Sequence, residues 1–254
     1  MHAPGDNRAF VPAAIRRVVR PEPASYKPPV LNHGESPMAD YATQRFNMVE
    51  SQVRTNDVTD PRIHAALSAV TRETFVPAAR RATAYADVPV EIAPGRFLLD
   101  PRTFAKLLQL ASLRATDSVL DVACGTGYSS VVLGRIVARV TALEQDADLV
   151  RIASDMVPAS GATNVTVVQG GLTEGARAKA PFDAIFIQGA VESVPEQLLA
   201  QLAEGGRLVA ILRDGAQGRA HLYVREKGRV GSRPDFDATV PLLGGFRKVV
   251  GFVF

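Results

Sequence analysis

The sequence of 254 residues lacks the features that mark several classes of protein. Cys124 is its only cysteine, so no disulfide forms within the chain, which fits a reducing compartment such as the cytoplasm. The histidines, His2, His33, His64 and His221, show no metal-ligand spacing, so no metal site is expected. Because no run of about 18 apolar residues occurs, no membrane-spanning segment is expected either.

A large excess of one charge is also missing. The chain has 29 Lys and Arg residues against 26 Asp and Glu residues, a formal net charge of +3. The composition therefore predicts no broad region of positive potential, and the net charge does not indicate a nucleic-acid partner. The remaining composition, with 46% hydrophobic and 22% charged residues, is ordinary for a globular protein. The length suits one sizeable domain, or one domain with a tail.

Residues 1–37 differ in composition from the rest of the chain. They lack the apolar core of a secretory signal, and their prolines break helices and strands. Three interpretations stay open: a flexible tail, an upstream extension of a protein that starts at Met38, or an arm that binds a partner or a targeting factor. We expect one domain over 38–254, with a helical N-terminal part over 38–115 and a cofactor-binding core over 116–254.

Two helices are predicted ahead of that core. Thr59 before Asp60-Pro61 predicts a helix start that is capped by the threonine hydroxyl. Apolar residues then recur at spacings of four and three, which gives the helix one apolar face. A second helix is predicted over Thr103–Leu113. Together they predict a helical subdomain that packs on the core.

From Ser118 onward, short apolar strands alternate with helices. This alternation predicts an α/β fold with a doubly wound, mostly parallel sheet, of the Rossmann-like methyltransferase type. Late strands over His221–Arg225 and Arg247–Phe254 are expected to add antiparallel edges. The strands are predicted over Ser118–Ala123, Arg139–Leu143, Asn164–Gln169, Phe182–Ile187 and Arg207–Leu212, and the helices over Tyr128–Ala138 and Ala147–Pro158.

One further helix is predicted between the last two parallel strands. Ser193 and Glu196 have the spacing of a capping box, with the serine at the N-cap and the glutamate three residues later. The helix is expected to run through Leu202 and to end near Gly205-Gly206.

The first strand of the core leads directly into a glycine turn. The segment Asp121-Val122-Ala123-Cys124-Gly125-Thr126-Gly127 follows a buried strand and opens a helix, which is where a doubly wound sheet binds its ligand. Glycines at such a turn let backbone N–H groups approach the ligand closely. A dinucleotide fingerprint requires a third glycine, and Ser130 occupies that position, which weakens the case for NAD.

Two acidic residues favour S-adenosylmethionine as the ligand. Asp121 at the strand end is placed to accept hydrogen bonds from the turn or from the methionine ammonium of the cofactor. Glu144 ends the next strand, where an acid accepts both ribose hydroxyls. The predicted contacts are Asp121, Ala123, Gly125, Thr126, Gly127, Glu144, Gln145, Gly171 and Leu172. Cys124 has no neighbouring base, so a small buried residue is the expected role.

From about Gln44 onward the chain resembles the protein-L-isoaspartate O-methyltransferase family. The resemblance spans roughly 210 residues, and its N-terminal block is more diagnostic than the glycine turn. It implies a repair enzyme that methylates the free carboxylate of isoaspartyl residues in damaged proteins, with S-adenosylmethionine as methyl donor. The matching segments are MVESQVRTNDVTDPRI (48–63), ETFVPAA (73–79), AYADVPV (84–90), VLDVACGTGYSSVVL (119–133) and VPEQLLAQLAEGGRLV (194–209).

Two departures from the family pattern bear on function. The family carries Gln-Thr-Ile-Ser-Gln-Pro after a glycine, whereas Gly95 is followed here by Arg-Phe-Leu-Leu-Asp-Pro. Leu99 thus takes the position of the family's functional serine, and Phe97 that of its threonine. The resemblance also implies an adenine-binding Asp in a Gly-Asp-Gly motif, where this chain has Gly170-Gly171-Leu172. Backbone groups or another side chain must then bind the adenine.

These departures leave three interpretations of function open. The first is a carboxyl O-methyltransferase of the isoaspartyl type with an altered substrate site, in which Arg96 and Asp100 are candidate acceptor-binding residues. The second is a methyltransferase for a small carboxylate or another non-protein acceptor. The third is a non-catalytic, cofactor-binding regulatory module. Because an ionised carboxylate attacks the methyl group without a general base, no catalytic residue is assigned.

Overall fold

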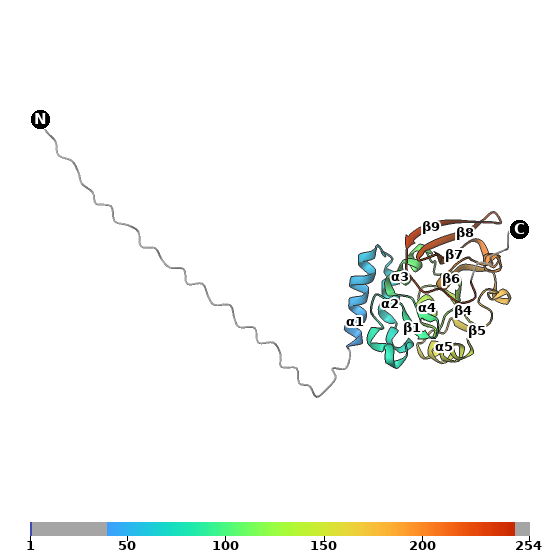
Figure 1. Ribbon diagram of the computed structural model, residues 1–254, viewed down its shortest axis with the longest axis horizontal. Coiled ribbons are helices and arrows are strands. Elements are labelled where there is room, and N and C mark those ends of the chain that lie inside the picture. The colour runs from blue at the N-terminus through green and yellow to red at the C-terminus, as the bar shows by residue number, and fades with distance from the viewer. Residues whose placement is uncertain (2–39, 247–254) are drawn as a thin grey trace. The chain divides into compact units, whose positions relative to one another are not determined.

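The computed structural model describes Met1 and residues 40–246 (Figure 1). The interpretations of residues 1–37 therefore lie outside the described residues, as does the predicted strand over Arg247–Phe254. Contacts divide the chain into Met1–Met38 and Ala39–Phe254, and the second unit holds every element named below. Within the described part, no helix combines the length and the apolar composition that crossing a membrane requires.

A seven-stranded sheet forms the centre of the second unit, with the order β5-β4-β3-β6-β7-β8-β9 (Figure 1). Strands β3 to β7 run parallel where they pair, and β8 and β9 add antiparallel pairs at one edge. A separate antiparallel hairpin is formed by β1 and β2. The bounds are β1 (Val90–Ala93), β2 (Arg96–Leu98), β3 (Ser118–Val122), β4 (Arg139–Glu144), β5 (Val165–Gln169), β6 (Phe182–Val191), β7 (Leu202–Asp214), β8 (Gln217–Glu226) and β9 (Arg229–Asp237).

One group of helices precedes this sheet in the chain, and a second group connects its parallel strands. The predicted doubly wound α/β fold with a helical N-terminal part is confirmed. The bounds are α1 (Tyr41–Met48), η1 (Val49–Val53), η2 (Arg54–Asn56), α2 (Pro61–Ala69), η3 (Arg72–Phe75), η4 (Ala78–Thr83), α3 (Pro101–Leu110), α4 (Tyr128–Gly134), α5 (Ala147–Ala159), η5 (Arg177–Lys179) and α6 (Glu196–Leu199).

The order of the strands reverses beside β3. The chain passes from β3 outward to β4 and β5, and then returns to β6 on the other side of β3. Neighbouring side chains on β3 enter different cores: Val119 packs in one buried cluster and Leu120 in another. In an open α/β sheet, ligands bind outside the carboxyl ends of the strands at such a reversal. The site is therefore sought where β3, β4 and β6 end.

Two predicted helix starts need correction. The cap of α2 is Asp60, whose Oδ1 accepts from the backbone N–H of Arg62 at 2.8 Å, while the hydroxyl of Thr59 accepts from Gln109. An aspartate adjacent to the first helical residue takes the cap because its carboxylate reaches the exposed N–H groups. Helix α3 begins at Pro101 instead of Thr103 and ends at Leu110.

The predicted helix after Ser193 is mostly wrong. Helix α6 covers only Glu196–Leu199, and no side chain caps it, so the capping box does not form. Strand β7 begins at Leu202, which pairs with Phe182 of β6, so pairing with the sheet overrides local helix preference. Helix α4 also ends early, at Gly134. Strand β9 was not predicted, because its largely exposed residues show no apolar alternation.

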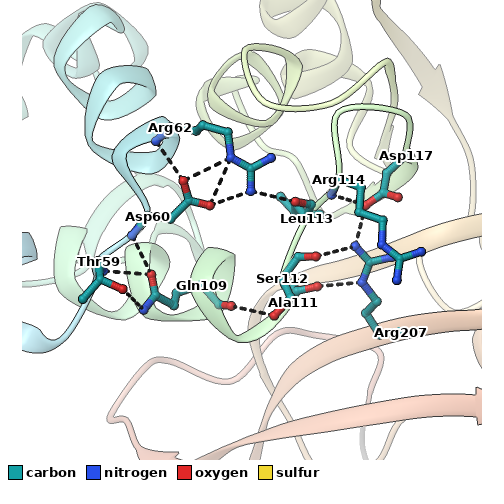
Figure 2. A network of polar contacts seen from close by, with 10 residues as sticks. All are labelled: Thr59, Asp60, Arg62, Gln109, Ala111, Ser112, Leu113, Arg114, Asp117 and Arg207. Carbon is teal, nitrogen blue, oxygen red and sulfur yellow. Dashed lines mark hydrogen bonds and ion pairs between the residues drawn. The ribbon is translucent and has the colours of Figure 1, made fainter.

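A polar network ties the N-terminal helices to the sheet (Figure 2). The buried guanidinium of Arg207 on β7 donates to the carbonyl oxygens of Ala111 at 2.6 Å and Ser112 at 3.0 Å, and it pairs with Asp117. These bonds satisfy carbonyl groups that the end of α3 leaves without helical partners. The network fixes α3, and with it the hairpin that precedes α3, against the central sheet.

Candidate functional site

The turn between β3 and α4 adopts the backbone that its glycines allow. Gly125 and Gly127 have φ angles of 59° and 95°, in the left-handed region that disfavours other residues. A Cβ at Gly127 would lie 2.8 Å from Cγ2 of Val157, so a side chain has no space there. Ala123 also has a positive φ, of 65°, and this strained conformation lies beside the predicted cofactor site.

Asp121 is fully buried at the end of β3 and accepts three side-chain hydrogen bonds. The hydroxyls of Ser129 and Ser130 each donate to Oδ2 at 2.6 Å, and the amide of Gln188 donates to Oδ1 at 2.7 Å. Burial raises the pKa of Asp121 to about 6, against the lowering effect of these donors. Ser130, which stands at the third glycine position of a dinucleotide motif, thus supports the carboxylate directly.

Glu144 is fully buried at the end of β4 and lies on the far side of the same turn. Backbone N–H groups donate to its carboxylate from Gly125 at 2.9 Å, Gln145 at 2.7 Å and Asp146 at 3.0 Å. The guanidinium of Arg96 binds both carboxylate oxygens, with Nη1 at 2.7 Å from Oε1. This pairing makes Glu144 the link between the glycine turn and the β1–β2 hairpin.

The remaining predicted cofactor residues lie around these two acids. The hydroxyl of Thr126 donates to the carbonyl of Phe75 at 2.7 Å, so its side chain holds the turn to η3. Gln145 is exposed next to Glu144. The backbone N–H of Gly170 donates to the carbonyl of Glu144 at 3.0 Å, which brings the following Gly171-Leu172 to the same edge. The predicted residues thus converge where three parallel strands end.

The two predicted acceptor-binding residues have other partners in the structure. Arg96 is engaged by Glu144, and the carboxylate of Asp100 caps α3 by accepting from the N–H of Thr103 at 2.8 Å. Asp100 is therefore explained by the helix start alone. Cys124 is buried, and burial raises the pKa of its thiol well above the usual value, which is the opposite of what a nucleophile requires.

Two small cavities, each of about 10 Å³, lie at Gln188, and one of them adjoins the glycine turn. Phe97, Leu99 and Gln188 line both cavities, which places these two apolar side chains beside the residue that donates to Asp121. One cavity also touches Cys124 of the glycine turn, and the other touches the segment around Leu243. The part of the lining that the two cavities share is therefore mainly apolar.

A wider cavity of about 580 Å³ lies elsewhere, at the turn between β7 and β8. His221 and Arg219 contribute to its lining, but none of the residues predicted to bind cofactor or acceptor does. Volume alone does not define a site. The two buried carboxylates, Asp121 and Glu144, lie at the glycine turn and not at this cavity.

Several residues of the site were not predicted from the sequence. Gln188 lies on a bulged segment of β6, where pairing with β7 shifts register between Phe186 and Ala190. Ile92 of β1 packs on Gly125, since a Cβ there would lie 2.5 Å from its Cδ1. A polar residue ending an apolar strand next to glycine was a usable signal for Gln188. No local pattern indicates the contact of Ile92.

Comparison with known proteins identifies the family. The profile described as protein-L-isoaspartate(D-aspartate) O-methyltransferase matches residues 43–240. A protein-L-isoaspartate O-methyltransferase of Koribacter versatilis (strain Ellin345) is 36% identical over 82% of this chain and 94% of its own length. One of Rhodopseudomonas palustris (strain ATCC BAA-98 / CGA009) is 39% identical over 70% and 81% of the two chains.

Solved structures agree on the fold. A protein-L-isoaspartate O-methyltransferase structure superposes with a TM-score of 0.69 at 23% identity, covering 81% of this chain and 66% of the other. A Plasmodium falciparum structure described as such an enzyme, in complex with S-adenosyl-L-homocysteine, gives a TM-score of 0.68 at 20% identity and covers 80% and 97%. At these identities the likeness supports the fold alone. With the profile and the sequence relatives, however, the chain belongs to the protein-L-isoaspartate(D-aspartate) O-methyltransferase family.

Proposed function

We propose that this protein transfers the methyl group of S-adenosylmethionine to the free carboxylate of isoaspartyl residues in proteins. One carboxylate oxygen forms a bond to the methyl carbon, and the carbon–sulfur bond breaks with its electron pair moving to sulfur. The products are a methyl ester and S-adenosylhomocysteine. The observation that carries the proposal is the pair of buried carboxylates, Asp121 and Glu144, on either side of a glycine turn at the sheet reversal.

The residues at the turn fit this cofactor. Gly125 and Gly127 adopt a left-handed backbone that disfavours other residues, and glycines at such a turn let backbone N–H groups approach a ligand closely. Glu144 supplies a buried carboxylate for ribose hydroxyls, and Asp121 supplies one near the methionine end. Backbone groups of Gly171 and Leu172 are proposed to serve the adenine in place of the missing acid. Bound there, the cofactor supplies an electrophilic methyl group on a sulfonium.

The protein's own contribution is alignment and exclusion of water. An ionised carboxylate is already a nucleophile, so the site needs no base, and holding two reactants in line supplies roughly 7–11 kcal/mol. Phe97 and Leu99 form an apolar wall beside the turn and exclude water from it. We place this chemistry in the cytoplasm, where a single reduced cysteine is stable.

Acceptor recognition is proposed to differ from the family pattern. Phe97 and Leu99 replace two hydroxyl side chains and cannot donate to the acceptor carboxylate. Gln188 is a polar side chain that borders both cavities, and we propose its amide as a contributor to acceptor binding. A small carboxylate would fit the same chemistry, so the test must include both kinds of acceptor.

The decisive experiment is transfer of a radiolabelled methyl group from S-adenosylmethionine. The acceptors are an isoaspartyl peptide, the same peptide with ordinary aspartate, and the small-molecule fraction of a cell lysate. Label that is lost in mild base and appears only on the isoaspartyl peptide supports the proposal. Label only on small acids would show that the acceptor is a small carboxylate and not an isoaspartyl protein. Binding of S-adenosylhomocysteine without transfer to any acceptor would favour the third interpretation, a non-catalytic regulatory module.

A further inference from the structure

The ribose-binding carboxylate of the proposed site is already fully engaged by the protein. Glu144 accepts three backbone N–H groups and two N–H groups of Arg96, five donors in all. A carboxylate offers about four lone-pair sites. The five present donors already exceed that number, so two ribose hydroxyls can bind without crowding the carboxylate further only if at least two of these donors leave.

The donors from Arg96 are the ones that are free to leave. The three backbone N–H groups belong to the glycine turn and the start of α5, and the same fold holds them in place. Arg96 reaches Glu144 with a long side chain from the start of β2. Its departure removes two donors in a fork, the number that a pair of vicinal hydroxyls supplies.

The hairpin that carries Arg96 also covers the glycine turn. Ile92 on β1 fills the space above Gly125, where a Cβ would lie 2.5 Å from its Cδ1. Among the described strands, β1 and β2 pair only with each other, so no backbone ladder ties the hairpin to the large sheet. Gly95, with a φ of 70° and open space around its α-carbon, forms the turn next to Arg96.

We propose that Arg96 sets the affinity for the cofactor by competing with the ribose for Glu144. The hairpin tip must release Glu144 before S-adenosylmethionine or S-adenosylhomocysteine binds. This proposal rests on the proposed function, because it takes Glu144 as the ribose-binding residue. It assigns to Arg96 a role in cofactor binding, distinct from the acceptor contact that the sequence indicated.

The test compares the parent protein with Arg96→Met, which keeps most of the side chain and removes both donors. Calorimetry with S-adenosylhomocysteine should show binding that is at least about tenfold tighter in the variant, since even one of the two lost hydrogen bonds to a charged group shifts an equilibrium by about that factor. Without ligand, the variant should melt at a lower temperature than the parent, because Glu144 loses its counter-ion. Affinity and stability thus move in opposite directions.

Arg80→Met is the matched control. Arg80 pairs with Glu91 of the same hairpin at 3.8 Å, but both side chains are exposed, so its loss should change neither readout. If Arg96→Met does not fold, Arg96→Lys takes its place, because lysine keeps the charge without the fork.

The outcomes separate this proposal from the proposed function. Binding by the parent, with equal or weaker binding by the Arg96 variant, overturns the competition and leaves the function standing. Binding only by the variant supports the competition in its strongest form. If neither protein binds S-adenosylhomocysteine, both proposals fail.

Discussion

Gln188 on the bulged segment of β6 donates a hydrogen bond of 2.7 Å to Oδ1 of Asp121 near the end of β3. The two hydroxyls on Oδ2 come from α4, so three donors from two elements meet on one buried carboxylate. Burial nevertheless dominates, and it raises the pKa of Asp121 to about 6 from an ordinary value of 3.8. The carboxylate therefore costs stability whenever it is ionised in the folded protein.

We expect Asp121→Asn to stabilise the protein relative to the parent as pH rises. The unfolded chain loses the Asp121 proton near pH 4 and the folded chain loses it near about pH 6, so the folded state binds more protons between these values. The free energy of unfolding then falls as pH rises through that window. A shift of about two units corresponds to about 3 kcal/mol. Urea unfolding at about pH 4 and about pH 7 measures the difference.

Asp155→Asn serves as the control, because Asp155 is an exposed carboxyl on α5. Replacing this solvated side chain should change the free energy of unfolding little at either pH. A difference for Asp121→Asn that also stays constant, or that shrinks as pH rises, would show that the buried carboxylate is better solvated than its contacts indicate.

The parts of the fold that were predictable are those with strong local signals. The strand from Ser118 was placed within one residue, because a continuous apolar run bounded by a glycine turn has few alternatives. The predicted helix is present at Leu198 and Leu199, but its predicted continuation through Leu202 is wrong, because an apolar segment fits either state. Here the decision came from Phe182, which pairs with Leu202 and lies far from it in sequence.

The candidate site was predictable in its acids and glycines but not in its contacts. Asp121 and Glu144 end strands that any parallel arrangement brings to one edge, so their proximity followed from the fold class. The pairing of Arg96 with Glu144 depends on where a separate hairpin packs, 48 residues away in sequence. No periodic pattern in the sequence indicates a contact between residues so far apart along the chain. The sequence alone therefore suggests acceptor binding for Arg96.

Loss of the Arg207 side chain should strongly destabilise the protein. Arg207→Met leaves Asp117 and the carbonyl groups at the end of α3 without their buried donor (Figure 2). Breaking a buried pair from one side costs about 3–5 kcal/mol. Arg219→Met is the control, since Arg219 pairs with Asp237 on the surface, where ion pairs contribute about 0–1 kcal/mol. Equal midpoints of urea unfolding for the two variants would contradict the structural role of the network.

Glu144→Ala should weaken binding of S-adenosylhomocysteine by roughly 1–3 kcal/mol, because hydrogen bonds to a buried charge are lost. Calorimetry gives the dissociation constant, and thermal melting shows whether the variant is folded. Glu144→Gln provides a second variant that keeps one oxygen for the N–H groups of the turn. Asp148→Ala, at an exposed position on α5, is the control. Parent-like affinity in both Glu144 variants would make the ribose assignment wrong.

The last prediction concerns the apolar wall beside the glycine turn. The resemblance of the sequence to the family implies hydroxyls at the positions of Phe97 and Leu99, and both residues line the cavities that adjoin Gln188. Leucine cannot donate a hydrogen bond, and burying a carboxylate without partners is costly. Methylation of isoaspartyl peptides by the parent should therefore be weak, and Phe97→Thr with Leu99→Ser should raise it.

The gain should appear mainly in kcat/KM and be at least about fivefold if one donor is regained, since one hydrogen bond contributes about 1 kcal/mol or more. Leu113→Ser is the matched control: Leu113 and Leu99 are both 4% exposed, but Leu113 lines neither cavity. A buried serine there should lower stability without raising the rate. If the parent already turns over isoaspartyl peptides efficiently and the double change slows it, then Gln188 and backbone groups suffice to hold the acceptor carboxylate. Leu99 would in that case act in packing alone.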